Sequence, residues 1–175
     1  AFRGASVSNI LRFKDDASRL QEVLFPQFDP KVMEQIRKGE RPENKIIGEG
    51  LPAGPGAVVG RAFFSSDAVV KAFEEAKEKY EQAKNAGASL EELARIEKEG
   101  IVTLVMTETD PNVVKAMGLA RGILTSRGGM TSHAAVVGRG MGKVVVVAAN
   151  ITVDEHNKKF IGADGTEVKE GEWFS

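Results

Sequence analysis

The sequence of 175 residues contains no cysteine and only two histidines, His133 and His156. Without cysteine there can be no disulfide, no thiolate nucleophile and no cysteine-ligated zinc, and the composition fits a reducing compartment. The two histidines lie too far apart in sequence to match the ligand spacing of a zinc site. We therefore expect this chain itself to bind no metal.

Long apolar runs and an excess of charge are also missing. No run approaches the roughly 20 apolar residues that cross a membrane, and the first residues lack the features of a signal peptide. The net charge is −1, and there is no basic stripe interleaved with aromatic residues. Apolar residues make up 42% and charged residues 28%, which is ordinary for a globular protein. We expect neither a membrane nor a nucleic acid as a partner.

Apolar runs alternate with helix signals in the second half of the chain. Three runs are typical of strands covered on both faces: 101–106, 122–125 and 144–148. Asp110 followed by Pro111 indicates a helix start, and another helix is expected over about 132–141. This alternation predicts an α/β fold with a βαβαβ core of parallel strands. The chain from Ile151 to Phe174 is expected to form hairpins.

The first half has a different character. Residues 1–45 are predicted to be a helical N-terminal linker segment, and residues 46–175 are predicted to form the main domain. Short strands are expected at 46–47 and 57–64. A helical hairpin insertion is predicted over about 66–99, because two amphipathic stretches flank a turn of small residues. The hairpin serves packing or contacts with a neighbour, and the sequence leaves both roles open.

One glycine-rich stretch joins a predicted strand to a predicted helix. Gly128 and Gly129 give its loop backbone freedom, and His133 falls in the first turn of the helix. Thr131 is a good N-cap candidate, with Ser132 as the other choice. The free N–H groups and the positive dipole end of a helix N-terminus favour an anion such as phosphate.

Two arginines flank this loop and could balance the charge of an anion. Arg127 precedes the loop, and Arg139 follows His133 by six residues, close enough for its long side chain to reach back. A neutral imidazole is a competent nucleophile, with an ordinary pKa near ~6.5. The residues alone therefore indicate an anion site that contains one histidine. A capping or packing role for His133, and structural pairing of the arginines, are the alternatives.

The run from Arg127 to Gly142 reads Arg-Gly-Gly-Met-Thr-Ser-His-Ala-Ala-Val-Val-Gly-Arg-Gly-Met-Gly. It resembles the phosphohistidine signature of the pyruvate, phosphate dikinase family, a group of PEP-utilising enzymes. Segments 24–30 and 46–64 match the same family. The run is similar, less closely, to pyruvate, water dikinase, which usually has cysteine in place of Ser132, and to Enzyme I of the sugar phosphotransferase system. The predicted hairpin departs from the family pattern.

The resemblance implies the central phosphohistidine domain of the family, a swivelling β/β/α domain, here with the added hairpin. It implies that His133 is the catalytic residue and forms a tele-phosphohistidine. Six residues would stabilise the phosphate: Arg127, Gly128, Gly129, Thr131, Ser132 and Arg139. Thr131 also matches a position of regulatory phosphorylation in plant members, with a plain capping role as the alternative.

The implied reaction converts ATP, pyruvate and phosphate into AMP, phosphoenolpyruvate and diphosphate. A nucleotide-binding domain and a pyruvate/phosphoenolpyruvate barrel of the same polypeptide would be the partners, so we expect this chain to be a segment of a longer enzyme. Mg²⁺ is expected in those domains, and a homodimer is expected for the full-length protein. The cytoplasm or an organellar matrix is the expected location.

Three rival interpretations remain open at this point. The first is the same carrier in a pyruvate, water dikinase or an Enzyme I-like phosphotransferase. The second is a binding module that keeps the loop but carries no phosphoryl group. The third is a regulatory domain that binds an anion.

Overall fold

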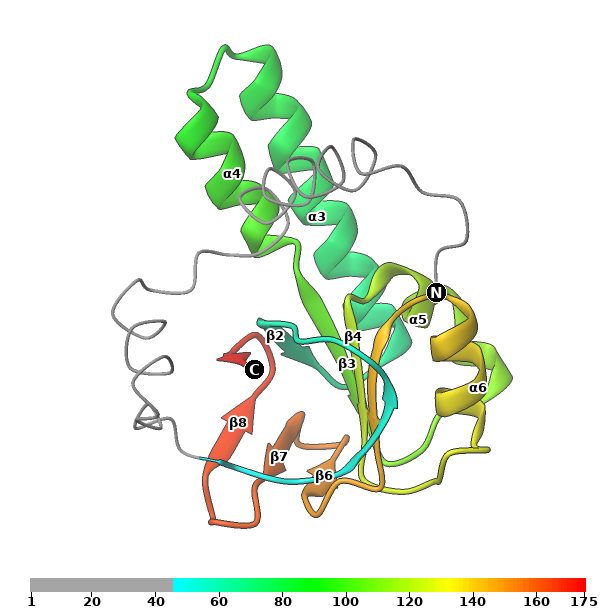
Figure 1. The fold of residues 1–175 in the computed structure, drawn as a ribbon. Helices are drawn as coiled ribbons and strands as arrows, with labels where there is room; N and C mark the ends of the chain where they lie inside the picture. The colour runs from blue at the N-terminus through cyan, green and yellow to red at the C-terminus, as the bar shows by residue number, and fades with distance from the viewer. Residues whose placement is uncertain (1–45) are drawn as a thin grey trace, which may run out of the picture. The chain divides into compact units, whose positions relative to one another are not determined.

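A six-stranded sheet runs through residues 46–175, the part of the chain that the computed structural model describes (Figure 1). Its strands, in sheet order, are β1 (Leu51–Gly54), β5 (Val144–Val147), β4 (Gly122–Thr125), β3 (Val102–Met106), β2 (Gly60–Phe63) and β9 (Trp173–Phe174). The four central strands are parallel, and β1 and β9 pair antiparallel at the two edges. The linker predicted for residues 1–45 lies outside the described residues.

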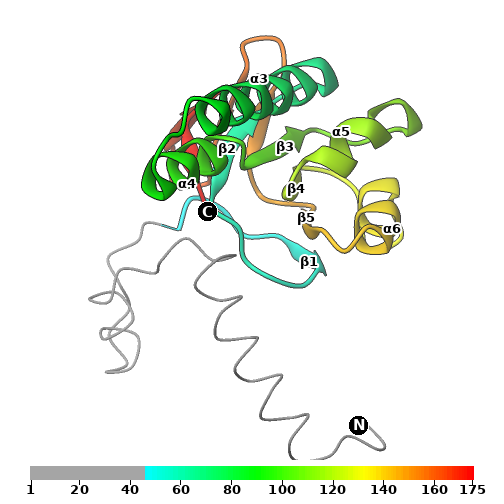
Figure 2. The same cartoon turned by 90° about the horizontal axis from the view of Figure 1, so that it is seen from above.

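Helices cover one face of this sheet, as the view from above shows (Figure 2). The helices are α3 (Ser66–Asn85), α4 (Leu90–Glu99), the 3₁₀ turn η1 (Pro111–Val113), α5 (Val114–Leu119) and α6 (His133–Gly140). At the N-termini that precede α6, three side chains act as caps: Ser65 accepts from Ala68 N, Ser89 from Glu92 N, and Asp110 from Asn112 N. These caps explain why the helices begin where the sequence predicts them.

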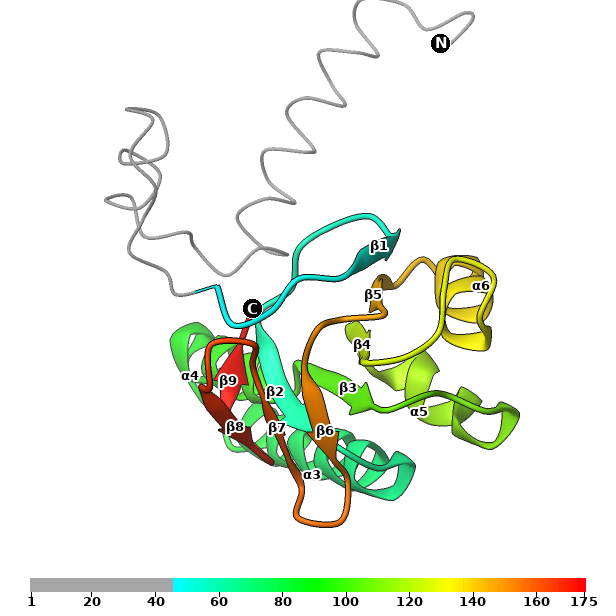
Figure 3. The same ribbon diagram turned by 90° about the horizontal axis from the view of Figure 1, so that it is seen from below.

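A smaller antiparallel sheet covers the opposite face (Figure 3). It consists of β6 (Thr152–Asp154), β7 (Lys159–Ile161) and β8 (Glu167–Lys169). Neighbouring residues of β3 face opposite cores, because side chains alternate along a strand. Leu104 packs with the helices, whereas Val105 packs with Phe160 and Val168 of the small sheet. The result is three layers, helix, large sheet and small sheet, so the α/β class and the parallel core are confirmed.

Two predictions for the start of the described chain need correction. Residues 46–50 form no strand; the first strand is β1, which begins at Leu51 and contains Pro52. Proline is tolerated there because β1 is an edge strand, where one row of N–H groups has no partner to lose. The strand predicted over 57–64 is shorter in the structure, where only β2 (Gly60–Phe63) is a strand. At Gly60, the first residue of β2, the strands β2 and β3 approach closely, since a Cβ there would lie 2.7 Å from Thr103 Oγ1.

Helices α3 and α4 form the predicted hairpin and pack on each other. Three α3 residues are buried, Val69, Ala72 and Ala76, but only Ile96 of α4 is. The spacing of Glu75 and Lys79 on α3 predicts an i, i+4 ion pair, but the structure pairs each with another residue. Glu75 lies 3.8 Å from Lys71, and Lys79 lies 3.8 Å from Glu99, because α4 brings a second carboxylate close to that lysine.

Candidate functional site

The loop of residues 126–132 connects β4 to α6 at the carboxyl edge of the parallel strands. Open α/β sheets bind ligands at this edge, because loops and helix N-termini meet there. The six residues that the sequence places around His133 all belong to this loop and to α6. The structure therefore brings the predicted site residues into one local unit.

Backbone hydrogen bonds from the neighbouring strand hold the start of the loop. Ser126 N donates to Met106 O at 3.2 Å, and Arg127 N donates to Thr107 O at 2.9 Å. The Thr125 hydroxyl, which is fully buried, donates to Arg127 O at 2.7 Å. Both the N–H group and the carbonyl of Arg127 are thus hydrogen-bonded, so the loop leaves the sheet in a fixed direction.

Gly128 then makes the sharp turn that the loop requires. Its φ is +95°, a conformation that residues with a side chain rarely adopt. A Cβ at this position would also lie 2.9 Å from Ser132 Cβ. Gly129 is different, because a Cβ there would meet nothing within 4 Å. The turn closes where Ser132 N donates to Gly129 O at 2.9 Å.

Ser132, and not Thr131, is the N-cap of α6. Its backbone is extended, and its hydroxyl accepts from Ala135 N at 3.4 Å. Thr131 lies one residue earlier and is exposed. Both residue types cap helices well, and the Gly128 turn decides between them because it brings Ser132 back over the loop. The preferred cap of the sequence analysis is therefore wrong by one residue.

His133 is the first residue of α6 and is half-buried. Its Nε2 atom is buried and makes no hydrogen bond within residues 46–175. A buried polar atom without a hydrogen-bond partner costs free energy. We infer that Nε2 of His133 finds its partner in another state of the protein. The other end of α6 is pressed on the sheet, since a Cβ at Gly138 would lie 2.6 Å from Val145 Cγ2.

The two arginines differ in what they contact. Arg139 reaches back as predicted, but its guanidinium donates to the loop carbonyl of Met130 at 3.1 Å. Arg127 is exposed, and its backbone holds the loop. The sequence has no Asp or Glu between Asp110 and Asp154, so the segment that contains the loop is cationic. Such a surface favours an anion over a cation.

The sequence analysis predicts neither of two features at this edge, one a contact and the other a buried hydroxyl. Glu155, in the turn after β6, accepts from Thr107 N at 2.7 Å. Thr109, in the loop after β3, is buried, and its hydroxyl makes no hydrogen bond in the described part of the chain. No local pattern predicts the contact, because Glu155 and Thr107 are 48 residues apart in the sequence.

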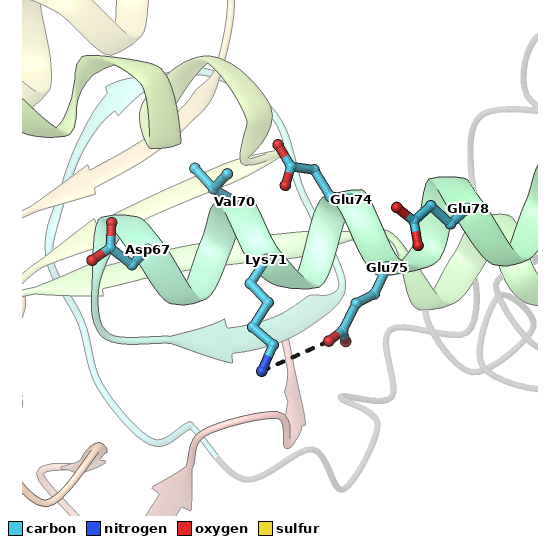
Figure 4. A pocket seen from close by; sticks show the side chains of 6 residues that line it. All are labelled: Asp67, Val70, Lys71, Glu74, Glu75 and Glu78. Atoms are coloured by element: carbon cyan, nitrogen blue, oxygen red, sulfur yellow. Dashed lines mark ion pairs between the residues drawn. The ribbon is translucent and has the colours of Figure 1, made fainter.

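Outside the His133 loop, residues 46–175 contain fewer features of a binding or catalytic site. A hollow on α3 is lined by Asp67, Val70, Lys71, Glu74, Glu75 and Glu78, and none of these residues belongs to the His133 loop (Figure 4). Within residues 46–175 no group of three His, Asp or Glu side chains could hold a metal ion. No helix in that range is long and apolar enough to cross a bilayer. His156 lies in an exposed turn.

Comparisons with known proteins match the His133 loop within a family model and most of the chain to individual relatives. The family described as "PEP-utilising enzyme, mobile domain" matches residues 98–168, which include β3, the His133 loop and the small sheet. The chain is 40% identical over 162 residues to pyruvate, phosphate dikinase 1 of Arabidopsis thaliana, which is chloroplastic, covering 91% of this chain and 13% of that protein. The pyruvate, phosphate dikinase of Rhizobium meliloti (strain 1021) is 40% identical over 152 residues, 86% of this chain and 13% of its own length.

The Clostridium symbiosum pyruvate, phosphate dikinase is 37% identical over 161 residues, 91% of this chain and 15% of the relative. The resemblance inferred from the residues around His133 is thereby confirmed. These relatives are dikinases, a class of phosphotransferase. The chain spans only 13–15% of the length of these three relatives.

Proposed function

We propose that this chain is the phosphoryl-carrying domain of a pyruvate, phosphate dikinase, with His133 as the residue that is transiently phosphorylated. The observation that carries the proposal is the position of His133 at the N-terminus of α6, inside the run that resembles the phosphohistidine signature. The matches to dikinases from plants and bacteria support it. In the proposed reaction, ATP, pyruvate and phosphate give AMP, phosphoenolpyruvate and diphosphate.

The covalent step is a nucleophilic displacement at phosphorus. The lone pair of His133 Nε2 forms the N–P bond while the bond from the β-phosphorus of ATP to its leaving oxygen breaks, and AMP takes the electron pair. Orthophosphate then accepts the terminal phosphoryl group as diphosphate. The remaining phosphoryl group passes from Nε2 to pyruvate, and the N–P electron pair returns to the imidazole.

This step requires the imidazole to turn. Nε2 is buried in the structure, so it cannot meet phosphorus until rotation about the side-chain bonds exposes it. Side-chain rotations are fast compared with enzymatic turnover, and this movement need not limit the rate. The inward orientation protects the nucleophile until a phosphoryl donor is present.

The surroundings of His133 suit a phosphoryl group that must also leave. The N-terminal N–H groups of α6 attract the negative charge, and Thr131 and Ser132 supply hydroxyl groups beside it. Gly128 and Gly129 let the backbone approach closely. Arg139 can exchange its Met130 carbonyl for phosphate oxygens, and Arg127 adds a second guanidinium. We keep Thr131 as a candidate regulatory phosphosite because it is exposed beside the histidine.

The partners belong to the same, longer polypeptide. We propose a nucleotide-binding domain and a pyruvate/phosphoenolpyruvate barrel, between which this domain swivels, and a homodimer for the full-length enzyme. We propose that Mg²⁺ takes part in the reaction and is bound in the two partner domains, because it binds mainly through one or two carboxylates together with substrate phosphates. The cytoplasm or an organellar matrix is the proposed location.

The test is label transfer to the isolated chain. The chain is mixed with a separately prepared phosphoenolpyruvate-binding domain, Mg²⁺ and phosphoenolpyruvate labelled in its phosphoryl group. The corresponding segment of the Rhizobium meliloti enzyme is the positive control, and His133→Asn is the negative one. We expect acid-labile, base-stable label on the wild type alone. No label on the wild type, with the positive control labelled, would overturn the proposal.

The need for orthophosphate distinguishes the proposed function from the two rival settings of the same carrier. A pyruvate, water dikinase or an Enzyme I-like phosphotransferase would use the same carrier without orthophosphate. We expect the full-length protein to form phosphoenolpyruvate from ATP and pyruvate only when orthophosphate is supplied. Equal formation without orthophosphate would assign the carrier to a pyruvate, water dikinase.

A further inference from the structure

We propose that Glu155 is a positioning residue for the His133 loop and acts through the backbone of Thr107. This inference rests on the proposed function of that loop. Glu155 lies in the turn that joins β6 to β7 of the small sheet, whereas the loop follows β4 of the large one. The proposal therefore assigns the small sheet a direct part in placing the phosphoryl carrier.

Two hydrogen bonds, joined through the backbone of Thr107, connect Glu155 to the loop. Its Oε1 accepts from Thr107 N at 2.7 Å, and the carbonyl of Thr107 accepts from Arg127 N at 2.9 Å. The Arg127 carbonyl in turn accepts from the Thr125 hydroxyl at 2.7 Å. The residue after Arg127 is Gly128, which makes the turn towards His133. Glu155 is thus two hydrogen bonds away from the peptide on which the loop pivots.

The turn that carries Glu155 is itself well fixed. Asp154 ends β6, and its carboxylate accepts from Asn157 N at 2.9 Å and from Asn157 Nδ2 at 2.7 Å. On the other side, Val153 pairs with Phe160, which is fully buried between the two sheets. Because this turn is fixed, the Glu155 carboxylate can hold the Thr107 N–H in place. A carboxylate on a mobile loop would move together with the N–H group that it binds.

The carboxylate also has a chemical advantage at this place. A hydrogen bond from a backbone N–H to a charged oxygen is shorter and stronger than one to a neutral carbonyl. Without Glu155, the Thr107 N–H would turn to water, and the Thr107 carbonyl would lose its fixed orientation towards Arg127. Glutamine keeps an acceptor oxygen at the same reach, whereas alanine removes it. This difference gives the proposal a sharp test.

The first readout needs only the chain itself. Amide hydrogen exchange is measured by NMR for the wild type, Glu155→Ala, Glu155→Gln and Glu167→Ala. Glu167 is the matched control, because its carboxylate also belongs to the small sheet but pairs with Lys159. We expect Glu155→Ala to speed exchange at Thr107 and Arg127 by roughly two- to tenfold, in line with the loss of one hydrogen bond. Glu155→Gln should restore most of the protection, and Glu167→Ala should leave both amides unchanged.

The second readout is the rate of labelling of His133 in the transfer assay described above. We expect Glu155→Ala to lower the maximal rate by roughly two- to tenfold at an unchanged half-saturating concentration of the partner domain. Unchanged exchange at Thr107 and Arg127 in Glu155→Ala, or the same losses in Glu155→Gln or Glu167→Ala, would overturn the positioning role. If exchange follows the prediction while the wild type takes no label, the contact stands and the proposed function fails.

Discussion

The two histidines lie in turns that are built in opposite ways. The His133 loop is held by the backbone of β3 and by the buried hydroxyl of Thr125, and it leads into a helix. The His156 turn is held by its own carboxylate, Asp154, and lies open to solvent. Nε2 of His133 is buried without a partner in the described residues, whereas His156 is exposed.

The difference shows what turns a histidine into a candidate carrier. Exposure alone would favour His156, which can reach any solute. The His133 loop instead offers a helix N-terminus, a cationic segment and a backbone that is fixed from outside the loop. Four predictions test this contrast, and they follow from the largest expected effect to the smallest.

The largest effect is expected where α6 presses on the sheet. A Cβ at Gly138 would lie 2.6 Å from Val145 Cγ2 and 3.1 Å from Ile123 Cδ1. Because both neighbours are buried, we expect Gly138→Ala to lower the free energy of unfolding by about 1–3 kcal/mol. Gly140→Ala is the matched control in the same helix, since its Cβ would meet nothing within 4 Å. Urea unfolding should show no loss for that control, and equal losses would refute the tight contact.

The second effect concerns the turn of the loop. Gly128→Ala places a side chain at φ +95° and against Ser132. We expect a loss of about 1–2 kcal/mol in unfolding free energy, because that backbone conformation strains an L-residue. Gly129→Ala should cost clearly less in the same urea titration. A greater loss for Gly129→Ala would mean that the loop does not turn at Gly128.

The third effect isolates the hydroxyl that holds the loop. Thr125→Val keeps the buried volume but removes the donor to Arg127 O. We expect a loss of about 0.5–1.5 kcal/mol in unfolding free energy, the net value of one hydrogen bond. Thr125→Ser keeps the hydroxyl, so its Arg127 and Gly128 amide resonances should stay near the wild-type positions while those of Thr125→Val move. Matching shifts in both variants would argue against the hydroxyl.

The smallest effect belongs to the His156 turn and appears only in acid. Hydrogen bonds from the side chain and backbone of Asn157 hold the pKa of Asp154 below its ordinary value. The carboxylate therefore stabilises the fold above the ordinary Asp pKa of about 4, and this contribution is lost as the pH falls through the lowered value. NMR titration should show the low pKa in the wild type and a rise in Asn157→Ala. A pKa of Asp154 that is the same in both proteins would contradict the contact.

The sequence predicts the parallel core and α6 because their signals are local. Each of these signals consists of residues that are close together in the sequence. They are the apolar runs, the helix start at Asp110–Pro111 and the glycine loop. The N-cap was misjudged because Thr131 and Ser132 have the same capping chemistry, and only the turn at Gly128 separates them. The amphipathic pattern of the predicted hairpin favours burial of Leu90 in α4, yet this residue is 85% exposed.

Long-range contacts were beyond such reasoning. The bond between Glu155 and Thr107 depends on how the small sheet stacks on the large one, which no short pattern encodes. The inward orientation of Nε2 likewise depends on packing around α6. Sequence alone therefore predicted the loop and helix that carry His133, but not how the loop is held.

The most direct test locates the phosphoryl group on the protein. The chain is phosphorylated as described, kept at alkaline pH, and analysed by tandem mass spectrometry of its peptides and by phosphorus NMR. The account predicts one phosphoryl group, on Nε2 of His133, and none on His156. A phosphoryl group on His156, or on Nδ1 of His133, would contradict it.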